Sequence, residues 1–298
     1  MHKTVLLHES VDALNLTKGG IYVDCTAGAG GHTEEIVKRM NDQVKVIGLD
    51  LDEDALKRSE ERIKNTNLKS DVLWRLSNFR NFDSVLSEEK IEKVDGFLLD
   101  LGFSSYQIED SGRGFSFLRD EPLEMTLQKT AGPADITAKM IVNEWSEESI
   151  ANIIYGYGNE RFSRRIAREI VSVREKELIE TTSQLVGIIE NAVPFFYRKG
   201  RIHPATKTFQ ALRIAVNDEL GALEEFLEKS FDFLNQDGRI AIISFHSLED
   251  RIVKNFFRKK KDEKEGVLVV KKPIVPKDEE LKENPRSRSA KLRIIQKK

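Results

Sequence analysis

Short apolar runs alternate with helical patterns over the first hundred residues of the chain. The apolar runs predict strands at 21–25, 44–50, 71–76 and 95–101, and the segments between them predict helices near 32–41, 52–64 and 79–90. Asp52 is the expected N-cap of the second of these helices. Such an alternation is typical of a doubly wound α/β sheet, which binds ligands at the carboxyl ends of its strands.

This alternation stops for roughly a hundred residues in the middle of the chain. From Ser111 to Pro204 the pattern is helical and turn-like, with a helix start expected at Ser146. Strand-like runs return only at 239–245, 267–271 and 292–296. An inserted helical domain explains this better than one uninterrupted sheet. The sequence therefore predicts one α/β domain formed by 1–110 and 205–298, with a helical domain of 111–204 inserted into it.

A glycine loop follows the first predicted strand and points to a nucleoside ligand. Asp24 ends the strand, Gly28, Gly30 and Gly31 follow it, and Asp50 ends the second strand. Glycines let the backbone approach a ligand closely, and the second acid can accept hydrogen bonds from ribose hydroxyls. The structural alternative is an ordinary tight turn between a strand and a helix.

The spacing within this loop separates two classes of cofactor. A dinucleotide fingerprint needs G-x-G-x-x-G, and here the third glycine falls on Thr33. The D-x-x-x-G-x-G-G spacing is instead close to the D-x-G-x-G-x-G loop of S-adenosylmethionine (SAM) methyltransferases, with Thr26 at the position of the first glycine. The spacing favours SAM over a nicotinamide cofactor.

A third acid, Asp100, ends the fourth predicted strand and is followed by Leu101-Gly102-Phe103. At the switch point of the sheet it can accept hydrogen bonds from the SAM amino group or from a substrate amine. Enzymes that methylate base amines often carry D/N/S-P-P-aromatic here; this chain keeps the acid and the aromatic residue but neither proline. The alternative is a strand-capping Asp before a glycine turn.

Composition narrows the class of protein. Of 298 residues, 39% are hydrophobic and 33% are charged, and the formal net charge is −2. No apolar run has the length of a membrane span, and the first residues lack a signal-peptide core, so we expect a cytosolic protein without a membrane partner. One cysteine excludes an internal disulfide, and the five scattered histidines give no reason to expect a metal site.

Because the net charge is nearly neutral, a surface for nucleic acid has to come from local clusters of cations. Four arginines share one helix face at i, i+3, i+4 and i+7, and further basic clusters follow in a loop, at a helix end and in the C-terminal tail. The clusters are Arg161, Arg164, Arg165 and Arg168; 198–201; 258–261; and 282–298. Each alone fits a solvated face, but together they favour a polyanionic substrate.

Longer motifs along nearly the whole chain carry a family resemblance. They are 2–7, 24–32, 100–107, 113–117, His203 to Ile214, Ser244 to Lys254, and 284–290. In these segments the chain resembles the bacterial 16S rRNA (cytosine-N4)-methyltransferases of the RsmH (MraW) family. The resemblance implies a Rossmann-like SAM-dependent methyltransferase fold with a seven-stranded, mostly parallel sheet, and a substrate-recognition role for the inserted helical domain.

The resemblance also implies an activity and a set of site residues. The activity would be SAM-dependent methyl transfer to N4 of a cytidine in the decoding region of 16S rRNA, in the small ribosomal subunit. Carried over by motif, the SAM contacts would be Gly30, Gly31, His32, Asp50, Phe79, Asp100 and Gln107. Asp100 is also the candidate catalytic residue, because a carboxylate there could position the N4 amine. Phe103 and Tyr106 are candidates for stacking on an unstacked base, or are packing aromatics.

Several single residues have simpler explanations. The adjacent Ser, His and Asp of 244–250 do not make a catalytic triad; Ser247 and Asp250 fit a helix N-cap pair, although His246 could still face the pocket. Cys25 is expected to be buried in packing. His203 and Lys207 could meet phosphate or the target nucleotide, but a turn followed by a helix start is the simpler explanation.

Two other function classes stay open on the sequence alone. A nicotinamide-dependent dehydrogenase would bind NAD and not SAM. A non-catalytic rRNA-binding assembly factor would tolerate loss of Asp100.

Overall fold

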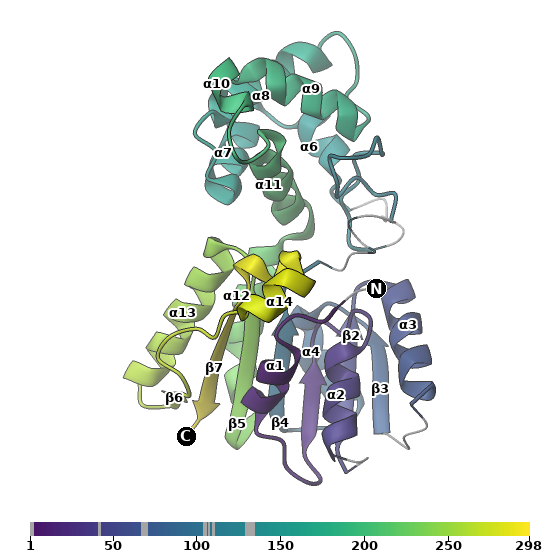
Figure 1. Ribbon diagram of the computed structural model, residues 1–298, viewed down its shortest axis with the longest axis vertical. Coiled ribbons are helices and arrows are strands. Elements are labelled where there is room, and N and C mark those ends of the chain that lie inside the picture. Colours follow the sequence, from purple (N-terminus) through teal and green to yellow (C-terminus); the bar gives the residue numbers. More distant parts are fainter. Residues whose placement is uncertain are drawn as a thin grey trace. The chain divides into compact units, whose positions relative to one another are not determined.

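The computed structural model describes residues 3–40, 43–66, 71–103, 106, 108, 111–128 and 135–298. They belong to two compact units, the first formed by Met1–Gly102 with Leu220–Lys298 and the second by Phe103–Glu219. Figure 1 shows a sheet with helices on both faces in the first unit and a group of helices in the second. The insertion expected at 111–204 falls inside the second unit, which extends beyond it at both ends.

A seven-stranded sheet forms the first unit, in the order β3-β2-β1-β4-β5-β7-β6. Strands β1 to β5 are parallel, and β7 runs antiparallel to both β5 and β6. The strands are β1 Ile21–Asp24, β2 Lys45–Asp50, β3 Asp71–Leu76, β4 Val94–Asp100, β5 Leu234–Ser244, β6 Gly266–Leu268 and β7 Lys291–Lys297. The α/β, Rossmann-like and mostly parallel sheet predicted from the sequence is confirmed.

Alternating side chains of the central strands form a core on each face of this sheet. Phe97 and Leu99 of β4 enter one core, and Leu98 between them enters the other. The first core is closed by α4 (Phe82–Glu88), α12 (Glu219–Phe233) and α13 (Ser247–Asp262), and the second by α1 (Leu7–Leu14) and α2 (Gly31–Met40). Helix α3 (Glu53–Lys64) packs against β2 and β3.

Aromatic rings anchor the first of these cores. The rings of Phe82, Phe97 and Phe226 meet edge to face, with centroids 4.9 to 5.4 Å apart, the geometry that the quadrupoles of aromatic rings favour. All three side chains are fully buried. This packing fixes β4, the strand that ends in Asp100, against the helices that cover it.

The second unit has its own hydrophobic core and well-defined helix starts. Its helices are α6 Ala138–Glu144, α7 Glu147–Gly158, α8 Ser163–Arg174, α9 Thr182–Ala192, α10 Phe195–Arg198 and α11 Ala205–Asn217. Ser146 caps α7 by accepting a hydrogen bond from the Ser149 N–H, as predicted, and Thr181 and Gln184 form a reciprocal capping box on α9.

Short elements complete the first unit. They are η1 Phe79–Asn81, α14 Asp278–Glu283 and η2 Pro285–Ser289. Within the described part of the chain, no helix is long and apolar enough to cross a membrane.

Candidate active site

Three carboxylates lie at the carboxyl ends of three adjacent strands. Asp24 ends β1, Asp50 ends β2 and Asp100 ends β4. Strand β1 lies between the other two, and the strand order reverses between β1 and β4. In open α/β sheets, this switch point is where ligands bind.

Backbone hydrogen bonds to the two neighbouring strands, β2 and β4, hold the glycine loop that follows β1. The Cys25 N–H donates to Leu98 O of β4, and the Ala27 N–H donates to Leu49 O of β2, both at 2.8 Å. Gly28 and Gly30 adopt φ of +55° and +75°, which other residues rarely adopt. The loop therefore has one defined path from β1 into α2.

The two positive-φ glycines of the loop face different surroundings. A Cβ on Gly30 would lie 3.1 Å from Ser59 of α3, so that glycine allows close packing. A Cβ on Gly28 would meet only Thr26 O, at 3.8 Å, so Gly28 borders open space. Ser59 also donates its hydroxyl to Gly28 O at 2.8 Å. Ser59 of α3 therefore supports one side of the loop, and the open space beside Gly28 leaves the loop accessible to a ligand.

The Asp50 carboxylate fastens this loop with both of its oxygens. Oδ2 accepts from the Gly28 N–H and Oδ1 accepts from the Asp52 N–H, each at 2.8 Å. Burial raises the pKa of Asp50 to about 6, although these two hydrogen bonds oppose the shift. Each oxygen keeps a second lone pair. Asp50 can therefore organise the loop and still accept a hydrogen bond from a ribose hydroxyl.

Asp24 ties the start of the loop to the start of α2, since its Oδ1 accepts from the Thr26 N–H at 3.4 Å. Its Oδ2 accepts from the Thr33 hydroxyl at 2.7 Å, and its side chain is buried. Burial raises its pKa to about 6. Thr33 occupies the position of the third glycine of a dinucleotide fingerprint, and its buried side chain fills that position, which argues against the pyrophosphate of a nicotinamide cofactor.

Asp100 is tied to the same loop through its backbone. Its N–H donates to the Thr26 hydroxyl at 2.6 Å, and its Oδ1 accepts from the Gly102 N–H at 3.2 Å. Gly102 is needed here, because a Cβ would lie 2.7 Å from the Phe245 ring. Asp100 is thus held between the end of β1 and the segment that follows β5.

The pKa of Asp100 is raised further than the pKa values of Asp24 and Asp50. Burial raises its pKa to about 7, and the negative charges of Asp24, Glu249 and Glu280 add to the shift against the Gly102 hydrogen bond. Its side chain remains partly accessible. A carboxyl group poised between its charged and neutral forms suits a ligand that carries positive charge.

The other predicted cofactor contacts have varied surroundings. Gly31 begins α2, and His32 is buried in its first turn. Phe79 follows β3 in η1, edge-on to Phe226 at 6.0 Å. Gln107 lies outside the described residues.

The two aromatic residues suggested for base stacking lie in the second unit. Phe103 packs under the Arg213 guanidinium, 4.1 Å from its ring centroid, and against Phe115. Tyr106 is exposed. Phe103 is therefore a packed aromatic within that unit.

The prediction that Ser247 and Asp250 cap a helix is wrong. The N-cap of α13 is His246, whose ring nitrogen accepts from the Glu249 N–H, while the Glu249 carboxylate accepts from the N–H groups of Phe245 and His246. Asp250 instead pairs with Arg293 and Lys291 of β7. The serine fits the usual pattern of an N-cap, but the histidine one position earlier has the extended backbone that a cap requires.

Two further sequence hypotheses concern Cys25 and the start of α11. Cys25 is buried in the core as expected, and burial holds the pKa of its thiol well above the usual range, which makes it a poor nucleophile. The turn and helix start at 203–205 are confirmed: His203 Nδ1 accepts from the Ala205 N–H, and its ring stacks on Phe117. Lys207 donates to Asn159 O at 3.0 Å.

An aromatic and cationic surface lies in the second unit, and the sequence signalled its cations but not its aromatic residues. It comprises Phe195 and Phe196 of α10 with Arg161, Arg165 and Lys199. The two phenylalanines are 67% and 66% exposed. The Arg161 guanidinium lies over the rings of Phe162, Tyr197 and Phe196, and Lys199 lies over Phe195. We call this set the aromatic–cationic surface.

Comparison with known proteins adds a family. The model of the MraW methylase family matches residues 1–298. A "Ribosomal RNA small subunit methyltransferase H" from Acetivibrio thermocellus is 48% identical over 311 aligned positions, covering 99% of this chain and 98% of the relative. A protein of the same name from Clostridium botulinum (strain Kyoto / Type A2) is 46% identical, covering 99% of this chain and 98% of that relative.

Solved structures are similar to this chain only at a distance. The Streptococcus mutans protein SMU.1697c, in complex with SAH, has a TM-score of 0.47 and 14% identity over 100% of both chains.

Proposed function

Because the chain belongs to the MraW methylase family, we propose that it transfers a methyl group from SAM to N4 of a cytidine in the decoding region of 16S rRNA. The small-subunit rRNA methyltransferases that resemble it over 99% of its length support the substrate class. Since substrate and product are parts of the small ribosomal subunit, we also place the protein in the cytoplasm.

The observation that carries the proposal is the position of Asp100. Its carboxyl lies at the switch point of the sheet, and its backbone is tied to the glycine loop through Thr26. A residue that serves both a cofactor and a transfer acceptor has to lie where the two meet. No other described carboxyl at the strand ends combines partial exposure with a pKa raised to about 7.

The residues present fit SAM. Gly28 borders open space in which a nucleoside can lie, and Asp50 keeps free lone pairs for ribose hydroxyls. Gly30 ends the loop, and Gly31 and His32 begin α2. Phe79 follows the carboxyl end of β3, where its ring would pack beside the adenine. Gln107 is proposed as a further contact on the family motif alone.

Asp100 would bind the amine that receives the methyl group. When bound, SAM supplies a methyl group on a sulfonium that is already activated for transfer. The N4 amine of cytosine is a poor nucleophile because its lone pair is delocalised into the ring. A hydrogen bond from that amine to the ionised Asp100 carboxylate shifts electron density towards nitrogen and stabilises the positive charge that develops there. The same bond orients the amine.

We propose the second unit as the substrate-recognition unit. The aromatic–cationic surface offers exposed rings on which unstacked bases can stack and guanidinium groups that can meet phosphates. Arg164 and Arg168, also exposed on α8, would extend its positive charge. Two exposed phenylalanines beside several cations are better explained by binding of a single-stranded region of RNA than by packing in a protein core.

The test is methyl transfer from tritiated SAM to free 16S rRNA, 30S subunits and 70S ribosomes, followed by analysis of the nucleosides. The proposal requires N4-methylcytidine. Tritium in N6-methyladenosine would assign a different acceptor, and binding of RNA without transfer would favour a non-catalytic assembly factor.

A further inference from the structure

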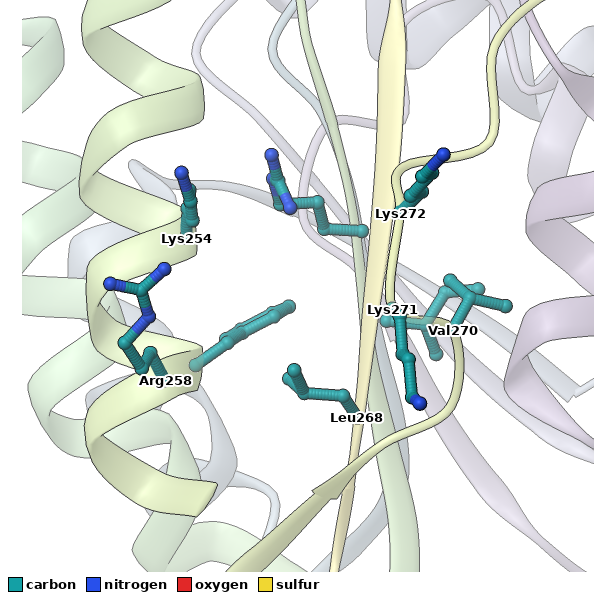
Figure 2. A pocket seen from close by; sticks show the side chains of 9 residues that line it. Lys254, Arg258, Leu268, Val270, Lys271 and Lys272 are labelled. Carbon is teal, nitrogen blue, oxygen red and sulfur yellow. The ribbon is translucent and has the colours of Figure 1, made fainter. Parts of the chain in front are cut away.

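A cationic pocket lies on the first unit, between α13, β7 and the segment 268–272 (Figure 2). Figure 2 shows Lys254 and Arg258 on α13, and Lys271 and Lys272 on the other side of β7. The pocket is lined by Lys254, Phe257, Arg258, Leu268, Val270, Lys271, Lys272, Arg293 and Ile294. Five of these nine side chains are basic, four are apolar and none is acidic.

The course of the chain beside β7 explains why the pocket exists. The Val269 N–H donates to Ile294 O, and Ile274 exchanges two hydrogen bonds with Leu292. Between these two attachments the chain leaves the edge of the sheet and carries Lys271 and Lys272 outward. Pro273 lies in this detour and has no N–H to donate. The bulge therefore opens a hollow opposite α13.

Most of the cations around the hollow are not neutralised. Arg293 donates to Asp250 Oδ1 at 2.7 Å, and Lys291 contacts the same carboxylate at 3.2 Å. Burial favours the neutral acid, but the hydrogen bonds from Arg293 and Lys291 lower the pKa of Asp250, so it stays ionised at neutral pH. One carboxylate is thus shared between two cations.

The four remaining basic side chains are exposed and form no ion pair with any described residue: Lys254, Arg258, Lys271 and Lys272. Like charges this close repel one another. An anion between them would relieve that repulsion, and the two lysines of the bulge could meet it from the side opposite α13.

The size of the pocket indicates which kind of anion fits. Its volume is about 70 Å³. Since a site for one water occupies about 10–15 Å³ on this measure, the pocket holds roughly five water-sized groups. That is close to the size of one phosphate group and well below that of a nucleoside.

We propose that this pocket binds a backbone phosphate of the RNA substrate. The proposal rests on the proposed function, because it takes RNA as the polyanion. Arg258 supplies a guanidinium fork that matches phosphate geometry, and the lysines supply mobile point charges. The site adds affinity and register without reading sequence.

The register of the sheet relates the pocket to Asp100 within the first unit. Asp100 pairs with Ile243 of β5, and Ile243 pairs with Leu292 of β7, the neighbour of Arg293. Two strand spacings place the backbone of Arg293 about 10 Å from that of Asp100. At about 3.4 Å per stacked nucleotide, this corresponds to roughly three nucleotides. A phosphate held here would belong to a nucleotide close to the target in the same strand.

The experiment compares Lys271→Gln/Lys272→Gln with Lys18→Gln/Lys90→Gln. All four lysines are exposed and have no ion-pair partner among the described residues. Lys18 and Lys90, however, lie just before the amino ends of β1 and β4 and do not line the pocket. Both variants lose two charges. The probe is in vitro transcribed 16S rRNA, and its dissociation constant is measured at several salt concentrations without SAM. SAM binding is measured separately.

We expect the Lys271/Lys272 variant to bind RNA about three- to tenfold more weakly at 0.15 M salt. A plot of log K against log salt has a negative slope. The magnitude of this slope should decrease by about 0.7 for each phosphate that is no longer neutralised by a lysine. The control variant keeps the wild-type value, and both variants bind SAM normally. Equal affinity in wild type and the Lys271/Lys272 variant would overturn the proposal, as would an equal loss in the control. Because this binding assay needs no methyl transfer, its result is separate from the failure of the proposed activity.

Discussion

The Asp100 N–H donates a hydrogen bond to the Thr26 hydroxyl at 2.6 Å. This bond joins the end of β4 to the first residues of the glycine loop, which follows β1. The position of the candidate catalytic carboxylate is therefore coupled to the loop that would hold the cofactor. One hydroxyl group links the two halves of the site.

Replacing Thr26 by Val keeps the shape of the side chain and removes the acceptor for the Asp100 N–H. Because small displacements of a positioning group are costly, we expect kcat to fall about 10- to 100-fold. The KM for SAM should change little. Steady-state kinetics check this, and Thr26→Ser, which keeps the hydroxyl, is the matched control with near-normal kcat. A Thr26→Val enzyme as fast as the wild type would mean that this bond does not position Asp100.

Asp50 and Asp52 allow the role of the loop anchor to be separated from that of a helix cap. Asp50→Ala removes the acceptor for the Gly28 N–H and for ribose hydroxyls, so we expect the Kd for SAM to rise at least about tenfold, as for the loss of a charged hydrogen bond. Asp52→Ala removes the N-cap of α3, at a cost of about 1 kcal/mol of stability, and leaves the Asp50 carboxylate in place.

Calorimetric titration with SAM and thermal unfolding distinguish these two variants. Asp52→Ala should lower Tm while leaving the Kd for SAM close to the wild-type value. Unchanged SAM affinity in Asp50→Ala would remove Asp50 from the cofactor site.

Binding of SAM should depend on pH near neutrality. Burial raises the pKa of Asp100 to about 7, so the free protein holds a proton there below that pH. A cationic ligand favours the ionised carboxylate, so affinity rises with pH and binding releases a proton. Between pH 6 and 8 the ionised fraction of a group with this pKa grows roughly tenfold, and the Kd should fall by a similar factor.

Titrations in buffers of different ionisation enthalpy measure the protons released. Asp100→Asn should lose the component near pH 7 and keep a weaker one near pH 6 from Asp50, whose pKa is about 6. A Kd for SAM that is constant from pH 6 to 8 would contradict this description of the site.

The aromatic–cationic surface predicts a defect in RNA binding alone. Phe195→Ser/Phe196→Ser removes two exposed rings, and since base stacking contributes about 1–3 kcal/mol per base, the KM for RNA should rise tenfold or more. The SAM affinity and the helical content should not change. Leu178→Ser, at a position 58% exposed in the same unit, is the matched control. Filter binding and steady-state kinetics measure these effects. An unaltered KM for RNA would exclude stacking at this surface.

Most of the sheet could be predicted from the sequence because its strands are short apolar runs, and β1, β2 and β4 each end in an aspartate. The first four predicted strands agree with β1 to β4 to within about one residue at each end. Helix α1 was missed. It has only eight residues, and its N-cap, Leu6, is in the left-handed conformation without a side-chain hydrogen bond, so it lacks the usual start signal.

The site was predictable in its acids but not in its contacts. Asp50 and Asp100 stand out because each ends an apolar run before a turn. The contributions of Thr26, Ser59 and the pair of phenylalanines on α10 depend on residues far apart in sequence. The cap of α13 shows the same limit, since Ser247 has the better propensity and backbone geometry selects His246.

The central claim is that the Asp100 carboxylate positions the acceptor amine, and single-turnover methylation of 16S rRNA tests it most directly. Wild type, Asp100→Ala and Asp100→Asn are first saturated with tritiated SAM, at concentrations set by their own Kd values, and then mixed with the RNA. We expect a wild-type yield of N4-methylcytidine, a loss of at least about 100-fold in rate for Asp100→Asn, and no measurable transfer for Asp100→Ala. A wild-type rate in the SAM-saturated Asp100→Ala protein would contradict this claim.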